Sequence, residues 1–220
     1  MSVRRAAGRP ALAVLLVLLV ASCGEARLGP PPGSRRVSIP AAGGGTLEAI
    51  ELGSSPRVVV LSHGATTTKE DLYETAVAFA DDGWRAIAYD AGSDREADIE
   101  AVVGHARDTG AESIVLIGSS LGASLSIATA SELHADAVVS LSASADAFGA
   151  LGAAGELRVP LFVAAADGDQ PFAVDAGRIA GAAGVEPVIV GGDRHGAGMF
   201  RDHPELMDEV VAFADEATGG

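Results

Sequence analysis

Short apolar runs and amphipathic stretches alternate along the chain from residue 57 to its end. The apolar runs are rich in Val, Ile and Ala and cover residues 57–63, 85–90, 112–118, 136–142, 160–166 and 186–192. Their apolar residues are continuous, which indicates strands that are buried on both faces. Helical patterns lie between most of these runs, at residues 69–82, 96–108, 120–133 and 173–183, and a last helix is expected from Pro204. The alternation predicts an α/β fold, in which a mostly parallel, doubly wound sheet is flanked by helices.

Two strands joined by a glycine-rich turn are expected ahead of this pattern, within residues 37–52. The chain has 220 residues, which suits one domain, and we expect that domain to span residues 37–220. Ligands of such sheets bind outside the carboxyl ends of the strands. The loops that follow the strands are therefore the places where reactive side chains are expected.

The first 36 residues have a different composition. Residues 1–10 carry three arginines and no acid, and residues 11–21 are almost entirely aliphatic. An apolar segment of this length is short for a membrane span and typical of a secretory signal, so residues 1–22 are predicted to be a signal peptide. Residues 23–36 include three consecutive prolines, which suits a tether.

The sequence VASC, residues 20–23, resembles the lipobox of bacterial lipoproteins. That resemblance implies that the thiol of Cys23 is acylated and that the signal is cut just before it. Cys23 is the only cysteine, so it has no disulfide partner within the chain, and lipidation gives the thiol a use. We therefore expect an exported protein that is anchored to the cell membrane through a lipid on Cys23. Ordinary cleavage nearby, for example after Ala21, is the alternative.

The charge balance narrows the possible partners. The formal net charge is −15 at pH 7, and such an acidic surface repels phosphate backbones, so nucleic acid is not an expected partner. No group of His, Cys and Asp residues has the spacing of metal ligands, so we expect neither a metal nor another cofactor. The oligomeric state is left open by the sequence.

The segment Gly118-Ser119-Ser120-Leu121-Gly122 joins a predicted strand to a predicted helix. It has the pattern G-x-S-x-G, in which a strained turn exposes a nucleophilic serine above a sheet. Ser120 has glycine two residues before it and two residues after it, whereas Ser119 has larger residues at both places. Ser120 is therefore the expected nucleophile.

A serine hydroxyl needs a base, and the chain has five histidines. His195 lies in a glycine-rich loop between the last predicted strand and the last helix, where catalysis requires a base, so we expect it to take the serine proton. His63 follows another strand and is expected to serve its turn. The acid that orients His195 should lie after residue 160, where both Asp167 and Asp169 follow a predicted strand.

These segments together resemble the α/β-hydrolase family, in particular its small lidless members that are similar to dienelactone hydrolases and minimal esterases. The resemblance covers residues 37–220 through four motifs, SHGAT, GSSLGA, AAADGDQPF and RHG. It implies an oxyanion hole formed by the backbone amides of Ala65 and Leu121. The spacing from Ala166 to Asp169 matches the position of the family's acid and favours Asp169, although the family usually has glycine in place of Ala166.

The connection at residues 142–159 is too short for the helical cap that many family members insert there, so an open site is expected. The bulky apolar residues of the loops could line an acyl pocket or be ordinary packing: Phe148, Phe172, Met199 and Phe200. The sequence thus predicts a serine hydrolase, a carboxylesterase acting on small or soluble acyl esters through Ser120, His195 and Asp169. The alternatives are an amide or peptide hydrolase, an acyltransferase with the same residues, or a non-catalytic binding lipoprotein.

Overall fold

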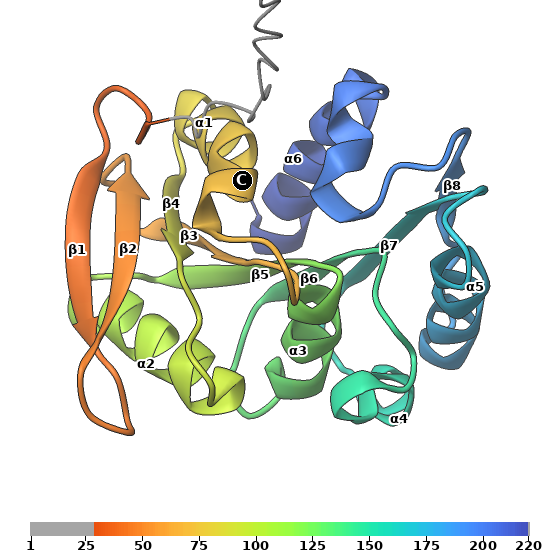
Figure 1. Ribbon diagram of the computed structural model, residues 1–220, viewed down its shortest axis with the longest axis horizontal. Helices are drawn as coiled ribbons and strands as arrows, with labels where there is room; N and C mark the ends of the chain where they lie inside the picture. The colour runs from red at the N-terminus through yellow and green to blue at the C-terminus, as the bar shows by residue number, and fades with distance from the viewer. Residues whose placement is uncertain (1–28, 220) are drawn as a thin grey trace, which may run out of the picture.

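A single eight-stranded sheet forms the centre of the protein (Figure 1), which is described here from a computed structural model that covers residues 29–219. Its strands are β1 (Arg35–Pro40), β2 (Thr46–Leu52), β3 (Arg57–Ser62), β4 (Arg85–Tyr89), β5 (Ser113–Ser119), β6 (Ala137–Leu141), β7 (Leu161–Ala166) and β8 (Val188–Val190). The order across the sheet is β1-β2-β4-β3-β5-β6-β7-β8. Strands β3 to β8 are parallel, whereas β2 pairs antiparallel with β1 and β4. The mostly parallel sheet predicted from the sequence is confirmed.

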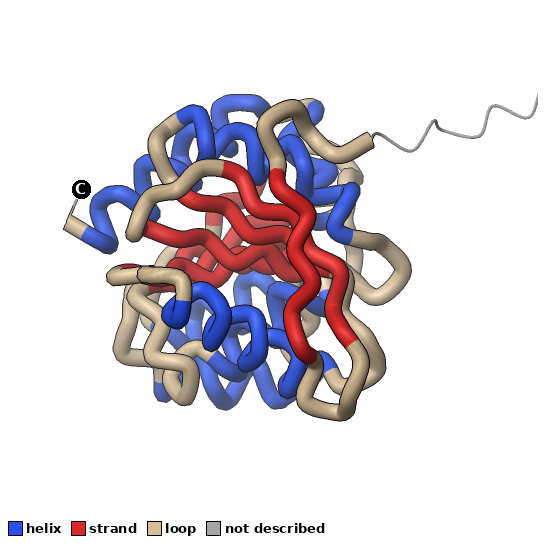
Figure 2. The backbone as a smooth tube through the Cα atoms, turned by 90° about the vertical axis from the view of Figure 1, so that its left-hand side faces the viewer, coloured by secondary structure: helices blue, strands red, loops and turns tan. Residues whose placement is uncertain are grey.

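Helices cover both faces of the sheet, as Figure 2 shows with the sheet between two helical layers. On one face lie α1 (Tyr73–Asp81) and α6 (Pro204–Thr218), and on the other lie α2 (Arg95–Asp108), α3 (Leu121–Thr129), α4 (Ala150–Glu156) and α5 (Phe172–Ala183). Three 3₁₀ helices, η1 (Lys69–Leu72), η2 (Ala147–Gly149) and η3 (Gly196–Arg201), complete the structure.

The structure differs from the predicted elements at a few boundaries. The helix expected over 69–82 divides into η1, which Thr68 caps through a reciprocal bond with Asp71, and α1. The helix expected over 120–133 ends at Thr129. The connection at residues 142–159 forms only η2 and α4, so it carries no cap.

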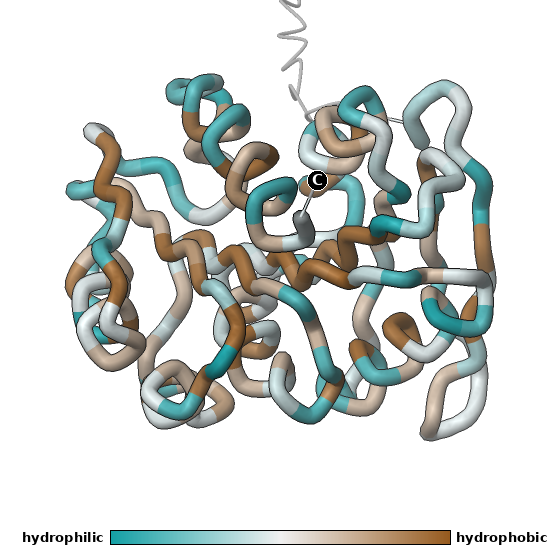
Figure 3. Tube along the Cα trace, turned by 180° about the vertical axis from the view of Figure 1, so that it is seen from behind, coloured by the Kyte–Doolittle hydropathy of each residue, from teal (hydrophilic) through white to brown (hydrophobic). Residues whose placement is uncertain are grey.

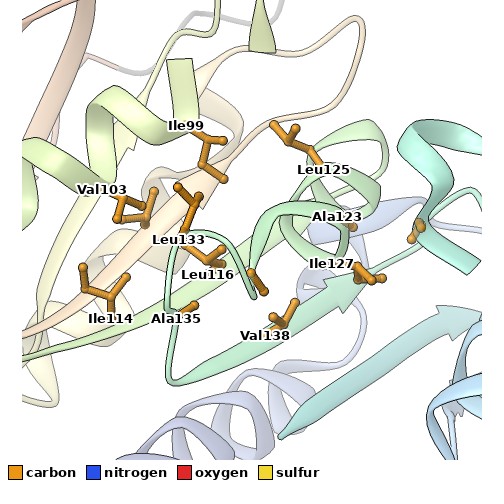
Figure 4. Packing of buried hydrophobic residues seen from close by; sticks show 14 of the residues in the cluster. Ile99, Val103, Ile114, Leu116, Ala123, Leu125, Ile127, Leu133, Ala135 and Val138 are labelled. Atoms are coloured by element: carbon orange, nitrogen blue, oxygen red, sulfur yellow. The ribbon is translucent and has the colours of Figure 1, made fainter. Parts of the chain in front are cut away.

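Two apolar layers hold the helices on the sheet (Figure 3). Figure 4 shows one layer, where Ile99 and Val103 of α2 and Leu125 of α3 pack over Leu116 of β5 and Val138 of β6. The opposite layer buries Phe79 and Trp84, whose rings meet edge to face at 5.7 Å. Because few aromatic side chains are available, most of this core is aliphatic, as the composition predicts.

The predicted signal peptide and Cys23 lie outside the described residues. The first strand begins at Arg35, two residues before the expected start of the domain. Among residues 29–219, the search for a helix that is both apolar and long enough to span a membrane finds none.

Gly122 brings the start of α3 against the end of β3. A Cβ atom at this position would lie 2.1 Å from the carbonyl oxygen of Ser62, a distance that no side chain tolerates. Gly118 is equally confined, because its Cβ would lie 2.3 Å from the backbone of Ala123. The two glycines therefore set how closely strand and helix approach one another at Ser120.

We predict that Gly122→Ala lowers the free energy of unfolding by about 1–3 kcal/mol, the usual cost of overpacking, because neighbouring backbone has to move. Gly104→Ala is the matched control, since Gly104 also lies within a helix and a Cβ there meets nothing within 4 Å. That change is expected to stabilise the protein by up to about 1 kcal/mol. Urea denaturation of both variants tests the prediction, and equal stability of the two would contradict it.

Candidate active site

Ser120 occupies the turn between β5 and α3 in a strained conformation. Its φ of 56° and ψ of −119° are rare for a residue with a side chain. The amide of Ser120 donates to the carbonyl oxygen of Leu141 at 2.8 Å, which fixes the turn to the end of the neighbouring strand β6. Strain of this kind persists only where the surroundings enforce it, and here the sheet and the two confined glycines do so.

Asp169 and His195 form a close pair beyond the ends of β7 and β8. The ring Nδ1 of His195 lies 2.8 Å from one carboxylate oxygen of Asp169 and 3.1 Å from the other. The Asp169 side chain is 8% exposed and that of His195 is 39% exposed, so the carboxylate is inside and the ring faces the solvent. If Nδ1 carries the proton and donates a hydrogen bond to Asp169, Nε2 has a free lone pair and can accept a proton.

Asp167 has a different contact. Its carboxylate accepts a hydrogen bond from the amide of Gly192 at 2.9 Å and is exposed. The amides of Asp167 and Gly168 in turn donate to the carbonyl oxygens of Val190 and Gly192. Asp167 therefore ties the loop after β7 to the loop after β8 and makes no bond to His195.

Ser120 and His195 line the same cavity, which has a volume of about 200 Å³. No hydrogen bond joins their side chains in the described part of the chain. Such contacts are often long without substrate and tighten when it binds. The cavity therefore brings the two residues together, while the bond between them is absent.

The loop at residues 63–67 forms another wall of this cavity and lies against Ser120. A Cβ on Gly64 would be 3.2 Å from the Cβ of Ser120. The ring Nδ1 of His63 donates to the carbonyl oxygen of Gly64 at 2.7 Å, and its Nε2 accepts from the amide of Ala91 at 3.0 Å. Burial lowers the pKa of His63, so the ring remains neutral, as these two bonds require. His63 thus serves the turn.

Arg95 holds the same loop from the far side. Its guanidinium donates to the carbonyl oxygens of His63 at 3.1 Å and Gly64 at 3.2 Å. Both carbonyl groups are thereby directed toward Arg95. The role of Arg95 has no signal in the sequence, because an arginine at the start of a helix does not indicate which loop it reaches.

The amides of Ala65 and Leu121 lie in the two segments that flank Ser120. Within residues 29–219, neither amide donates a hydrogen bond to another protein group. Leu121 is the first residue of α3, where amides have no partner in the helix and the helix dipole favours negative charge. These amides are therefore available to an anionic oxygen beside Ser120.

The bulky apolar residues expected near the site do not line this cavity. Met199 and Phe200 belong to the buried core beneath α6, and Phe148 packs against the opposite core. Phe172 instead contacts the ring of His195, with 4.3 Å between the ring centroids. Three of the four are thus ordinary packing, and the fourth supports His195.

Two of the remaining histidines and Asp90 have structural partners, and the third histidine, His134, is exposed beyond the end of α3. His105 Nε2 lies 2.7 Å from the buried carboxylate of Glu51, and His203 contacts the carbonyl oxygen of Gly191. Asp90 pairs with both the amide and the side chain of Lys69, so it organises the loop before η1. These contacts leave His195 as the histidine beside Ser120.

Comparisons with known proteins give a result only at the level of structure. The sequence matches no family model, and no curated protein matches it. An esterase of Pyrococcus furiosus is similar in structure, with a TM-score of 0.70 and 17% identity over 83% of this chain and 90% of that one. A dienelactone hydrolase of Anabaena variabilis has a TM-score of 0.64 and 18% identity over 83% and 95% of the two chains.

A third similar structure is an α/β serine hydrolase without a lid from Xanthomonas campestris. It has a TM-score of 0.64 and 16% identity, and the match covers 85% of this chain and 94% of that one. At such identities, the likeness establishes the fold. This chain has the fold of the lidless α/β serine hydrolases, in agreement with the resemblance found in its sequence.

Proposed function

We propose that this protein is a serine hydrolase, specifically a carboxylesterase that acts on small or soluble acyl esters. The observation that carries the proposal is that Ser120, in its strained turn, opens into the same cavity as His195, whose other ring nitrogen is bonded to the buried Asp169. A serine, a histidine and a carboxylate in this relation are the parts of a catalytic triad. The esterases of similar structure support the same class of reaction.

The reaction follows from the roles of these groups. The hydroxyl oxygen of Ser120 attacks the acyl carbon of the ester while its proton passes to Nε2 of His195. The amides of Ala65 and Leu121 stabilise the oxyanion of the tetrahedral intermediate, and each such donor contributes about 3 kcal/mol in a well-formed site. When the intermediate collapses, the leaving oxygen takes the proton from His195 and departs as the alcohol, and the acyl group stays on Ser120. A water molecule that gives its proton to His195 then attacks the acyl carbon, and the acid is released as Ser120 recovers its proton. Asp169 holds the ring and stabilises its protonated form.

The dimensions of the cavity favour a small substrate. A volume of about 200 Å³ is below the range of about 300–1,000 Å³ for ordinary small-molecule pockets. Short acyl groups therefore fit within it, whereas longer ones would extend into solvent because residues 142–159 provide no cap. The charged side chains at its rim, Asp71, Glu74 and Arg201, suit a polar substrate.

We also propose that the enzyme is exported and tethered to the cell membrane through a lipid on Cys23. The support is the sequence of residues 1–36, namely the basic start, the apolar segment, the VASC motif and the proline-rich tether. A tether would hold an open site near the membrane while leaving it accessible to soluble esters.

Ser120→Ala is expected to lower the turnover of p-nitrophenyl acetate by several orders of magnitude, on the order of 10⁶ for a complete triad. It should also abolish covalent labelling by a fluorophosphonate probe, because the attacking oxygen is gone. The melting temperature checks that the fold is intact. Labelling that persists in Ser120→Ala would refute the assignment, and an unlabelled wild-type protein would favour a non-catalytic binding role.

Asp169→Asn is expected to lower kcat by about 10⁴, because the amide no longer fixes the protonation state of the His195 ring. Asp167→Asn is the matched control. Its loss should be modest, since the carboxylate of Asp167 bonds to the amide of Gly192 and not to His195. Steady-state kinetics of both variants on one ester decide the matter, and a large loss confined to Asp167→Asn would transfer the role to that residue.

Cys23→Ser is expected to release the protein from the membrane fraction and to prevent labelling with a radioactive fatty acid. The catalytic domain should retain its esterase activity in the soluble fraction, because Cys23 lies outside it. A wild-type protein that carries no lipid and fractionates with soluble proteins would show that the signal is of the ordinary cleaved kind.

A further inference from the structure

Two serine hydroxyls hold the loop that carries His195. The amide of Gly196 donates to Oγ of Ser142 at 2.9 Å, and the amide of Ala197 donates to Oγ of Ser119 at 3.1 Å. These are the two amides that directly follow His195 in the chain. Ser119 ends β5 and Ser142 directly follows β6, so two neighbouring strand ends hold the loop.

The loop approaches Ser119 as closely as a backbone can. A Cβ on Gly196 would lie 2.1 Å from Oγ of Ser119, and Gly196 has a φ of +59°, in the left-handed region. Glycine is the residue that satisfies both conditions. The sequence RHG therefore has a physical reason: the residue after His195 must lack a side chain so that the Ser119 hydroxyl can reach the next amide.

Ser142 has a strained backbone conformation, although burial in the core does not itself require one. It is fully buried and has a φ of +53°, a conformation that costs on the order of 1 kcal/mol or more in a residue with a Cβ. Its amide donates to the carbonyl oxygen of Ala164 in β7 at 2.8 Å. Glycine would remove the strain but would also remove the hydroxyl that accepts from Gly196.

The outer part of the loop is held at residues other than His195. His203 contacts the carbonyl oxygen of Gly191, the Asp167 carboxylate accepts from the amide of Gly192, and Arg194 pairs with Asp202. Residues 191–195 are exposed, and the contacts of the His195 ring are with Asp169 and Phe172. Asp169 restrains only the side chain of His195. The backbone of His195 is held by the amide of Gly198, which donates to its carbonyl oxygen, and by the bonds of the two following amides to Ser142 and Ser119. A displacement of about 1 Å in a catalytic group can lower the rate by about 100-fold.

We propose that Ser119 and Ser142 are positioning residues that fix the backbone of His195 relative to Ser120. This inference rests on the proposed function. It explains the serine doublet, because Ser120 reacts while the adjacent Ser119 holds the base. One peptide unit at the end of β5 thereby sets the position of both partners in the proton transfer.

Ser119→Ala and Ser142→Ala should each lower kcat by about tenfold on p-nitrophenyl acetate. KM of Ser142→Ala should stay nearly unchanged, since Ser142 does not line the cavity, whereas Ser119 does. Ser126→Ala is the matched control. Ser126 is fully buried in α3, and its hydroxyl bonds to the carbonyl oxygen of Gly122 rather than to the His195 loop. Its kcat should stay within about twofold of the wild type. Wild-type kcat in both Ser119→Ala and Ser142→Ala would overturn the proposal.

A pair of variants of nearly equal shape separates hydrogen bonding from packing. Ser119→Thr keeps the hydroxyl, whereas Ser119→Val replaces it with a methyl group. We expect kcat of the threonine variant to exceed that of the valine variant by several-fold. Equal kcat in the two would show that the hydroxyl is not what matters. If Ser142→Ala does not fold, this series at Ser119 still decides the question.

A double-mutant cycle tests whether Ser119 acts through His195. In a His195→Ala background, adding Ser119→Ala should cause no further loss of the residual activity, because the base that Ser119 positions is gone. An equal tenfold loss in both backgrounds would show that Ser119 supports the nucleophile turn instead. The proposed function fails by a different result, namely wild-type turnover in His195→Ala or Ser120→Ala.

Discussion

The close approach of α3 to the ends of β3 and β5 is the constraint on which the candidate site depends. It requires that Gly118 and Gly122 have no side chains, because their Cβ atoms would lie 2.3 Å and 2.1 Å from backbone atoms. With these glycines, Ser120 is forced into its left-handed turn, and the free amides of α3 meet the loop that contains Ala65. The packing of these backbone segments, rather than contacts of side chains, thus sets the positions of Ser120 and the two amides.

The electrostatic part of the site is arranged differently. A carboxylate that is 8% exposed is costly to bury unless it is paired, and the Asp169 side chain is paired with His195 through both oxygens. His63 is the opposite case, since burial keeps its ring neutral and suits it to two loop bonds rather than to a pair with an acid.

The parts of the site that could be predicted from the sequence are those set by local patterns. The glycines around Ser120 identify the turn, and strand ends identify the loops of Asp169 and His195. The roles of Arg95 and Ser142 could not be predicted, because each acts across a distance in sequence, Arg95 on residues 63–64 and Ser142 on residue 196. Phe172, Met199 and Phe200 occupy similar loop sequences, and only the packing separates the ring beside His195 from two core residues.

Within residues 29–219, two of the four non-glycine residues with positive φ directly follow strands at the site. Ser120 and Ser142 both have positive φ, and they follow β5 and β6, which are adjacent in the sheet. The amide of Ser120 bonds to Leu141, the residue before Ser142, so the two strained turns are joined directly. A sheet buried on both faces can enforce such conformations, and the loop of His195 is bonded to the ends of two of its strands through Ser119 and Ser142. It follows that the sheet fixes the geometry of the site. In our proposal, the hydroxyls of Ser119 and Ser142 at the two strand ends fix the position of His195 relative to it.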